Sequence, residues 1–250
     1  MSDYIEGKRP VLEALKTHIP LKTILMADNL KRDGLVEDIL RKAKKAEVPV
    51  KMVRRRDLDD KSERGSHQGF IAIAKPFNYV NVQTIIDAAE SSAAERGGAA
   101  LVIILDHITD SGNLGAIARS AEVVGASGII IPNKRSARVN ASTYKSSAGA
   151  ISHIHVSQVA NIIQVVDRLK KEGYWIAGAS EKASGSIWEA NLKGKMALIM
   201  GSEDEGLARL TQENCDFLIR LPQVGKTGSL NVAQSATACM YEWFRQNEVK

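Results

Sequence analysis

From residue 99 onwards, short apolar runs alternate with stretches that have the spacing of amphipathic helices. The clearest run, Leu101–Leu105, is apolar at every position, as is typical of a strand covered on both faces. We expect further strands at 128–132, 153–156, 175–179, 196–200 and 217–221, and helices at 114–124, 162–172 and 231–246. This alternation predicts an α/β domain over residues 99–250, with a mostly parallel sheet and helices on both faces.

The first 76 residues have a similar alternation on a smaller scale. Strands are expected at 21–27, 49–53 and 69–74, and helices at 10–17 and 33–46. This pattern predicts a small α/β domain over residues 1–76. Residues 77–98 are expected to link the two domains, with one helix over 82–94 before the Gly97-Gly98 break.

The charge of the chain is concentrated in the first domain. Residues 1–76 hold 17 Lys and Arg against 12 Asp and Glu, whereas the remaining residues hold 17 of each kind. A basic excess confined to one segment favours a polyanionic partner, because Lys and Arg release counterions when they contact phosphates.

The composition also narrows the class of protein. No apolar run approaches the roughly 20 residues of a membrane span, and the first residues lack the apolar stretch of a secretory signal. Cys215 and Cys239 are far apart and have no cluster of histidines near them, so we expect buried thiols in a reducing cytoplasm and no metal site.

Three glycine-containing turns follow predicted strands, after Leu105, Met200 and Leu221. Ligands of open α/β sheets bind beyond the carboxyl ends of the strands, and glycine lets a backbone approach a ligand closely. One such turn alone is more often a tight connection, but three together favour a ligand site. The GKTGS sequence at 225–229 lacks the leading glycine of a P-loop, and no G-x-G-x-x-G follows the first strand, so ATP and dinucleotide sites are disfavoured.

These turns lie in three segments that carry a family resemblance. NLGAIARSAEVVGA (113–126), IMGSEDEGL (199–207) and LPQVGKTGSLNVAQSA (221–236) resemble the ordered motifs of SpoU-type RNA ribose 2′-O-methyltransferases, a trefoil-knot superfamily. The opening YIEGKRPVLEAL resembles the ribosomal-protein-like domain of a branch that methylates a guanosine in large-subunit ribosomal RNA. The resemblance implies a knotted α/β methyltransferase domain preceded by a small α/β domain that binds the substrate.

The resemblance also implies a cofactor and an assembly. S-adenosylmethionine would be held in a bent form by loop backbone at Gly201, Leu221 and Leu230, in a pocket shaped by Ser202, Gly206 and Gly225. Members of the family act as homodimers. The apolar face of the last helix either supplies the dimer surface or belongs to the core; it consists of Val232, Ala236, Met240, Trp243 and Phe244.

The resemblance assigns catalysis to a few polar residues. Arg119 would activate the ribose hydroxyl, and because a guanidinium with a pKa above ~12 is a poor base, orienting an RNA phosphate that takes the proton is the easier role. Asn113 and Glu203 would order the site, and Ser229 and Asn231 would flank Leu230 or cap the last helix. The chain departs from the family at Ser111-Gly112, where Pro-His is common, and at Gln223, where methionine is usual.

Two basic groups are candidates for RNA contact, with a solvated surface as the alternative. The first comprises Arg54, Arg55, Arg56, Arg64 and His67, and the second Lys134, Arg135, Arg138 and Lys145. Aromatic residues are few, so we expect stacking on bases to be secondary. His107, His153 and His155 are expected to be structural. Alternatives to a ribosomal RNA enzyme are the same reaction on transfer RNA or at an antibiotic-resistance site, and an RNA-binding module without catalysis.

Overall fold

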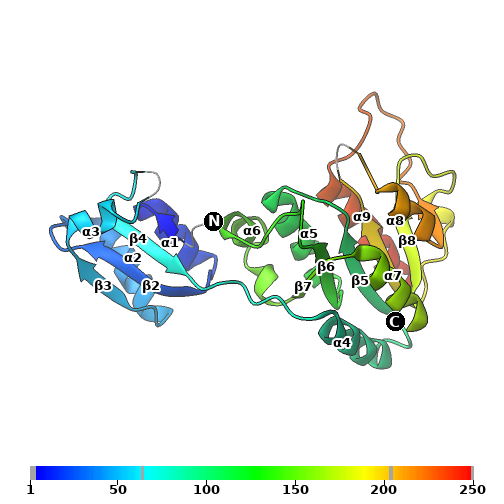
Figure 1. Ribbon diagram of the computed structural model, residues 1–250, viewed down its shortest axis with the longest axis horizontal. Helices are drawn as coiled ribbons and strands as arrows, with labels where there is room; N and C mark the ends of the chain where they lie inside the picture. Colours follow the sequence, from blue (N-terminus) through cyan, green and yellow to red (C-terminus); the bar gives the residue numbers. More distant parts are fainter. Residues whose placement is uncertain (1–3, 63–64, 203–204, 249–250) are drawn as a thin grey trace.

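The computed structural model describes residues 4–62, 65–202 and 205–248. Two units, each built on its own sheet, are joined by an extended segment (Figure 1). Arg64 and Glu203, both predicted to be functional, lie outside the described residues.

The smaller unit is a four-stranded mixed sheet in the order β1-β4-β2-β3. Its strands are β1 (Tyr4–Glu6), β2 (Leu21–Ala27), β3 (Val50–Val53) and β4 (Phe70–Ala74), and its helices are α1 (Lys8–Lys16), α2 (Gly34–Lys45) and α3 (Arg55–Asp59). Strands β2 and β3 are parallel, and the other pairs are antiparallel. The sequence missed β1 and α3, which at three and five residues are too short to display a period.

Each face of this sheet is covered by helices. Val11 of α1 and Ile39 of α2 pack against Ile24 and Phe70, while Leu58 of α3 packs with Ile71 on the other face. Helix α2 begins where the Asp33 carboxylate accepts from the N–H of Val36 at 2.9 Å, as expected of an N-cap.

The larger unit is a six-stranded, fully parallel sheet in the order β10-β8-β9-β5-β6-β7. Its strands are β5 (Ala100–Leu105), β6 (Gly128–Pro132), β7 (His155–Val159), β8 (Trp175–Ala179), β9 (Lys195–Met200) and β10 (Phe217–Ile219). The predicted mostly parallel α/β fold with a smaller N-terminal domain is therefore confirmed.

Helices cover both faces of this sheet, as the continuous apolar run of β5 predicted. Leu101 and Ile103 face α5 (Ser111–Val123) and α9 (Val232–Asn247), whereas Val102 and Ile104 face α4 (Val82–Glu95) and α7 (Ile162–Lys171). Helix α4, which the sequence placed in the linker, thus packs on the larger sheet.

Shorter helical elements complete this unit. They are α6 (Ala141–Ser146), α8 (Arg209–Asn214) and the 3₁₀ turns η1 (Ala150–Ser152) and η2 (Ile187–Glu189). Helix α6 approaches α5 so closely that a Cβ on Gly115 would lie 2.5 Å from the Thr143 carbonyl oxygen. No helix of the described residues is both long and apolar enough to cross a membrane.

The apolar face of α9 is used inside the chain. Val232, Ala236, Met240 and Trp243 are buried, and Phe244 packs partly against the same core. Of the two roles considered for this face, core burial accounts for these residues.

Candidate active site

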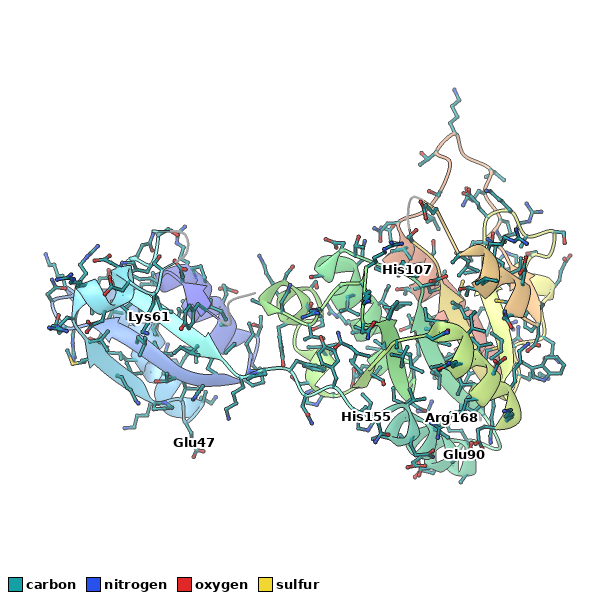
Figure 2. All side chains as sticks on the ribbon, viewed as in Figure 1. Glu47, Lys61, Glu90, His107, His155 and Arg168 are labelled. Atoms are coloured by element: carbon teal, nitrogen blue, oxygen red, sulfur yellow. The ribbon has the colours of Figure 1, made fainter. Side chains whose placement is uncertain are left out.

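The three predicted glycine turns leave one edge of the larger sheet. Strand β9 lies beside β5, and β8 separates β9 from β10, so in a parallel sheet the loops after these strands gather at the carboxyl edge. His107 follows β5 at this edge, whereas His155 begins β7 at the opposite edge (Figure 2).

A cavity of about 210 Å³ lies among these loops. Five of the six residues predicted to bind a cofactor line it: Gly201, Ser202, Gly206, Leu221 and Leu230. The sixth, Gly225, lies in an exposed segment and is not among the lining residues. Gln223, at which the chain departs from the family, does line the cavity.

Gly201 is required by a close approach of backbone. The N–H of Ser202 donates to the Gly206 carbonyl and the N–H of Gly206 donates to the Ser202 carbonyl, both at 3.0 Å. A Cβ on Gly201 would lie 2.2 Å from the carbonyl carbon of Gly206, and Gly206 has a φ of +70°. Both glycines are therefore needed to form this wall of the cavity.

Asp106 is a positioning residue that the sequence reasoning missed. Its carboxylate is 1% exposed; one oxygen accepts from the N–H of Ala208 at 2.8 Å, and the other lies 2.5 Å from Nδ1 of His107. Asp106 thus ties the loop after β9 to the end of β5. An acidic residue directly after a fully apolar run was the available signal, since a buried carboxylate needs such partners.

The structure brings together two predicted catalytic residues from distant parts of the chain. Nδ2 of Asn231 donates to Oδ1 of Asn113 at 3.0 Å, and Oδ1 of Asn231 accepts from the N–H of Ala233 at 2.9 Å. Asn231, rather than Ser229, therefore caps α9 and also meets the start of α5. Ser229 lines the cavity.

Arg119 is exposed on α5, six residues beyond Asn113. No salt bridge involves Arg119 among the residues that the structure describes, so the surface ion pair considered as its alternative role is not found there.

The second basic group lies beside the start of α5. Lys134, Arg135 and Arg138 are exposed after β6. The N–H of Ala137 donates to the Ile108 carbonyl at 2.7 Å, and Nδ2 of Asn140 donates to Ser111 at 2.9 Å. These bonds hold the basic loop against the segment that leads to Asn113.

The remaining basic residues are placed differently. Lys145 is exposed on α6, and Arg54, Arg55 and Arg56 are exposed on the smaller unit, none of whose described residues lines the cavity. Figure 1 shows α3, which contains Arg55 and Arg56, on the smaller unit. His67, grouped with them as a possible RNA contact, is buried; its Nε2 lies 2.8 Å from Asp59 and its Nδ1 accepts from Gly69. The RNA interpretation of His67 is therefore wrong, because its side chain is inaccessible.

The cavity has both apolar and charged walls. Glu181, Lys182 and Glu205 line it beside Leu221 and Leu230, which suits a ligand that combines apolar and cationic parts. Cys239 also lines it, but burial raises the pKa of its thiol to about 12, so this thiol stays protonated and unreactive at neutral pH. The described residues contain no cluster of His, Cys, Asp or Glu that could hold a metal ion.

Comparison with known proteins places this chain in a family. The model of the SpoU rRNA methylase family matches residues 100–241, and the model named RNA 2′-O ribose methyltransferase substrate binding matches residues 4–80. The chain belongs to the SpoU rRNA methylase family. It is an S-adenosylmethionine-dependent RNA 2′-O-methyltransferase, as the motifs predicted.

Individual SpoU relatives align over nearly the whole chain. A putative TrmH family tRNA/rRNA methyltransferase, YacO of Bacillus subtilis, is 37% identical over 98% of this chain and 96% of its own length. A similarly named protein of Staphylococcus aureus is 36% identical over 97% of this chain and 95% of its own length.

A solved structure has the same fold. The SpoU methyltransferase AviRb from Streptomyces viridochromogenes, in complex with AdoMet, superposes with a TM-score of 0.69 at 23% identity. The superposition covers 97% of this chain and 89% of AviRb.

Proposed function

We propose that this enzyme methylates the ribose 2′-hydroxyl of a guanosine in large-subunit ribosomal RNA. The observation that carries the reaction is the contact between Asn113 and Asn231 beside a cavity lined by five of the predicted cofactor residues. The N-terminal unit is basic and matches a substrate-binding family model, and both observations favour a large RNA as the substrate. Relatives are named tRNA/rRNA methyltransferases, so transfer RNA is the alternative substrate.

The residues of the cavity suit S-adenosylmethionine. We expect Gly201, Leu221 and Leu230 to hold it, with Ser202 and Gly206 shaping the wall and Gly225 reaching it only if the exposed segment moves inward. Glu181 and Glu205 offer negative charge to a ligand with cationic groups. When bound, the cofactor supplies an activated methyl group, so the protein has mainly to align the ribose and exclude water.

Arg119 is proposed to orient the RNA at this site. It is exposed on α5, the helix that has Asn113 in its first turn, and its planar guanidinium can bind a phosphate through two parallel hydrogen bonds. The phosphate oxygen then accepts the proton of the ribose hydroxyl. Asn113, Asn231 and Ser229 are proposed to order the loops around it, together with Glu203, which lies outside the described residues.

The exposed basic residues are proposed to hold the RNA backbone. Lys134, Arg135 and Arg138 lie beside the start of α5, and this position supports a role in contacting phosphates near the target. Lys145, Arg54, Arg55, Arg56 and Arg64 are proposed to contact more distant parts of the RNA.

We also propose a domain division and a location. Residues 1–76 are proposed to bind the substrate, and residues 77–98 to link the two domains, with α4 of this segment packed on the larger sheet. Residues 99–250 are proposed to form a knotted domain through which the C-terminal segment is threaded. The enzyme is proposed to work in the cytoplasm, where Cys215 and Cys239 remain thiols.

A homodimer is proposed to form through α5 and α9. These helices lie side by side where Ser120 and Thr237 approach to 2.7 Å, and one turn further along them Val123 and Tyr241 are 59% and 47% exposed. Light scattering of the Val123→Asp variant tests this surface. We expect a monomer, and a variant that remains dimeric would show that Val123 does not belong to the dimer interface.

The decisive experiment maps ribose methylation in ribosomal and transfer RNA with and without the gene. Without the gene, we expect one methylated guanosine to be lost from large-subunit RNA. A loss confined to transfer RNA would contradict this and identify transfer RNA as the substrate. Arg119→Ala is expected to abolish turnover and to spare cofactor affinity measured by calorimetry. Arg168→Ala, on the opposite face of the sheet, is the control; equal activity of both variants would remove Arg119 from the mechanism.

A further inference from the structure

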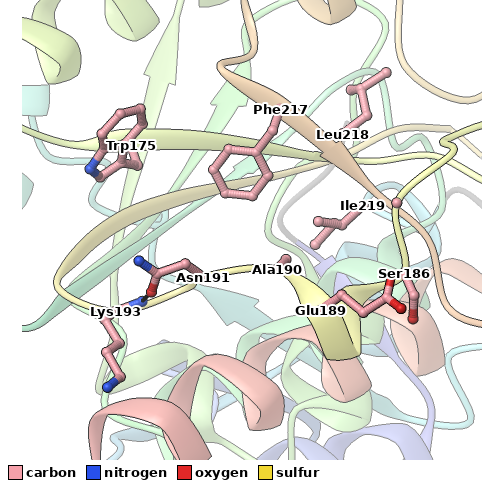
Figure 3. Close-up of a pocket in the computed structure, with 10 residues that line it drawn as sticks. Trp175, Ser186, Glu189, Ala190, Asn191, Lys193, Phe217, Leu218 and Ile219 are labelled. Atoms are coloured by element: carbon pink, nitrogen blue, oxygen red, sulfur yellow. Dashed lines mark hydrogen bonds between the residues drawn. The ribbon is translucent and has the colours of Figure 1, made fainter.

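A second cavity, of about 440 Å³, lies along β10 at the end of the larger sheet (Figure 3). Its strand wall is formed by Trp175, Phe217, Leu218 and Ile219, and its other residues belong to the segment after β8: Gly185, Ser186, Glu189, Ala190, Asn191 and Lys193. The reaction proposed above uses none of these side chains.

This cavity adjoins the proposed cofactor site. Ile219 lines both cavities. Trp175 lies four residues before Ala179, which lines the cofactor cavity, a distance of about 13 Å along an extended strand. A nucleotide close in sequence to the target can span such a distance.

The walls carry the groups that recognise a nucleotide. Trp175 is 59% exposed and Phe217 lies beside it, so an indole face is available for stacking (Figure 3). Glu189, Asn191 and Lys193 are exposed around the same cavity. A carboxylate accepts from the amino group of a base, and a lysine pairs with phosphate.

We propose that this cavity binds an unpaired base of the RNA substrate that is close in sequence to the methylated ribose. Trp175 is the stacking platform, Glu189 accepts from an exocyclic amino group of the base, and Lys193 contacts a phosphate. Unpaired RNA bases are commonly recognised by stacking on aromatic side chains and by hydrogen bonds to their edges. The proposal rests on the proposed function, since it identifies a subsite for that RNA.

The chain supplies a matched control for the stacking residue. Trp188 is 58% exposed, nearly the same as Trp175, but does not line the cavity. Loss of one base–aromatic stack weakens binding between about fivefold and a hundredfold. Trp175→Ala is therefore expected to raise the KM for RNA by such a factor and to leave kcat and cofactor affinity unchanged, while Trp175→Phe retains most of the affinity. If Trp175→Ala and Trp188→Ala have the same KM, the proposal is wrong.

A direct binding measurement is independent of turnover. In Trp188→Phe, fluorescence comes from Trp175 and the buried Trp243, and short oligo(A) or oligo(C) RNA is expected to quench it more strongly than oligo(U), which lacks amino groups. Glu189→Ala is expected to abolish that preference. Equal quenching after the further change Trp175→Ala would overturn the subsite. Absence of methylation on any RNA would instead overturn the proposed function and leave the quenching result standing.

Discussion

Gly201→Ala is expected to disrupt the cofactor cavity because the new Cβ meets rigid backbone. That atom would lie 2.2 Å from the Gly206 carbonyl carbon and 2.3 Å from the Leu207 nitrogen, whereas ordinary contact begins at 3.4 Å. The Gly206–Leu207 backbone must therefore retreat by about 1.2 Å, the difference between these distances. The neighbouring atoms are main chain, so no rotamer change can relieve the overlap.

The retreat has two measurable consequences. Overpacking of this kind costs about 1–3 kcal/mol, which lowers the melting temperature by roughly 2–4 °C for each kcal/mol in a chain of this size. A displacement near 1 Å at a reacting site costs about a hundredfold in rate. Calorimetry with S-adenosylmethionine and a methylation assay are expected to show weakened cofactor binding and a turnover loss of that order.

Gly225→Ala is the matched control. Gly225 was predicted from the same motifs to shape the pocket, yet a Cβ there would meet nothing within 4 Å and its φ lies outside the left-handed region. We expect near-normal cofactor affinity. If Gly201→Ala binds the cofactor like the unchanged protein, or if Gly225→Ala loses binding equally, the reasoning about the cavity wall is refuted.

Three further predictions concern the supports of the site. Asp106→Ala leaves the Ala208 N–H unpaired and is expected to cost about 1–3 kcal/mol of stability in chemical denaturation; a smaller effect than that of His107→Ala would contradict this. Asn231→Ser keeps a capping oxygen but is too short to reach Asn113, so turnover should fall while the melting temperature changes little; equal loss of both would mean that the cap alone matters. Burial raises the pKa of the Cys215 and Cys239 thiols to about 12 from 9.0. Between these two values the thiols lose their protons in the unfolded chain but keep them in the folded protein, so the free energy of unfolding is expected to be highest below pH 9 and to fall as the pH rises toward 12. A Cys239→Ala variant with an equally steep decline would show that other groups dominate.

Much of the fold follows from local sequence. Strands β2, β6 and β8 begin and end at the predicted residues, because short runs bounded by polar or glycine-containing turns have one plausible extent. Helix ends differ from the predictions by a few residues, as at α5, which starts three residues early because Asp110 accepts from the N–H of Asn113. Helices α6 and α8 were missed, since six residues are too few to display the helical period.

By itself, the sequence determined the class of fold, the order of the longer strands and helices, and the glycine turns where a ligand could lie. Periodicity and turn chemistry depend on neighbouring residues, so they can be inferred without coordinates. Only the tertiary structure placed Asn231 against Asn113 across 118 positions, excluded Gly225 from the cavity, buried His67 and opened a second cavity beside Trp175. These depend on which strands lie side by side and on how closely their loops pack, and such long-range contacts leave no periodic trace in a single chain.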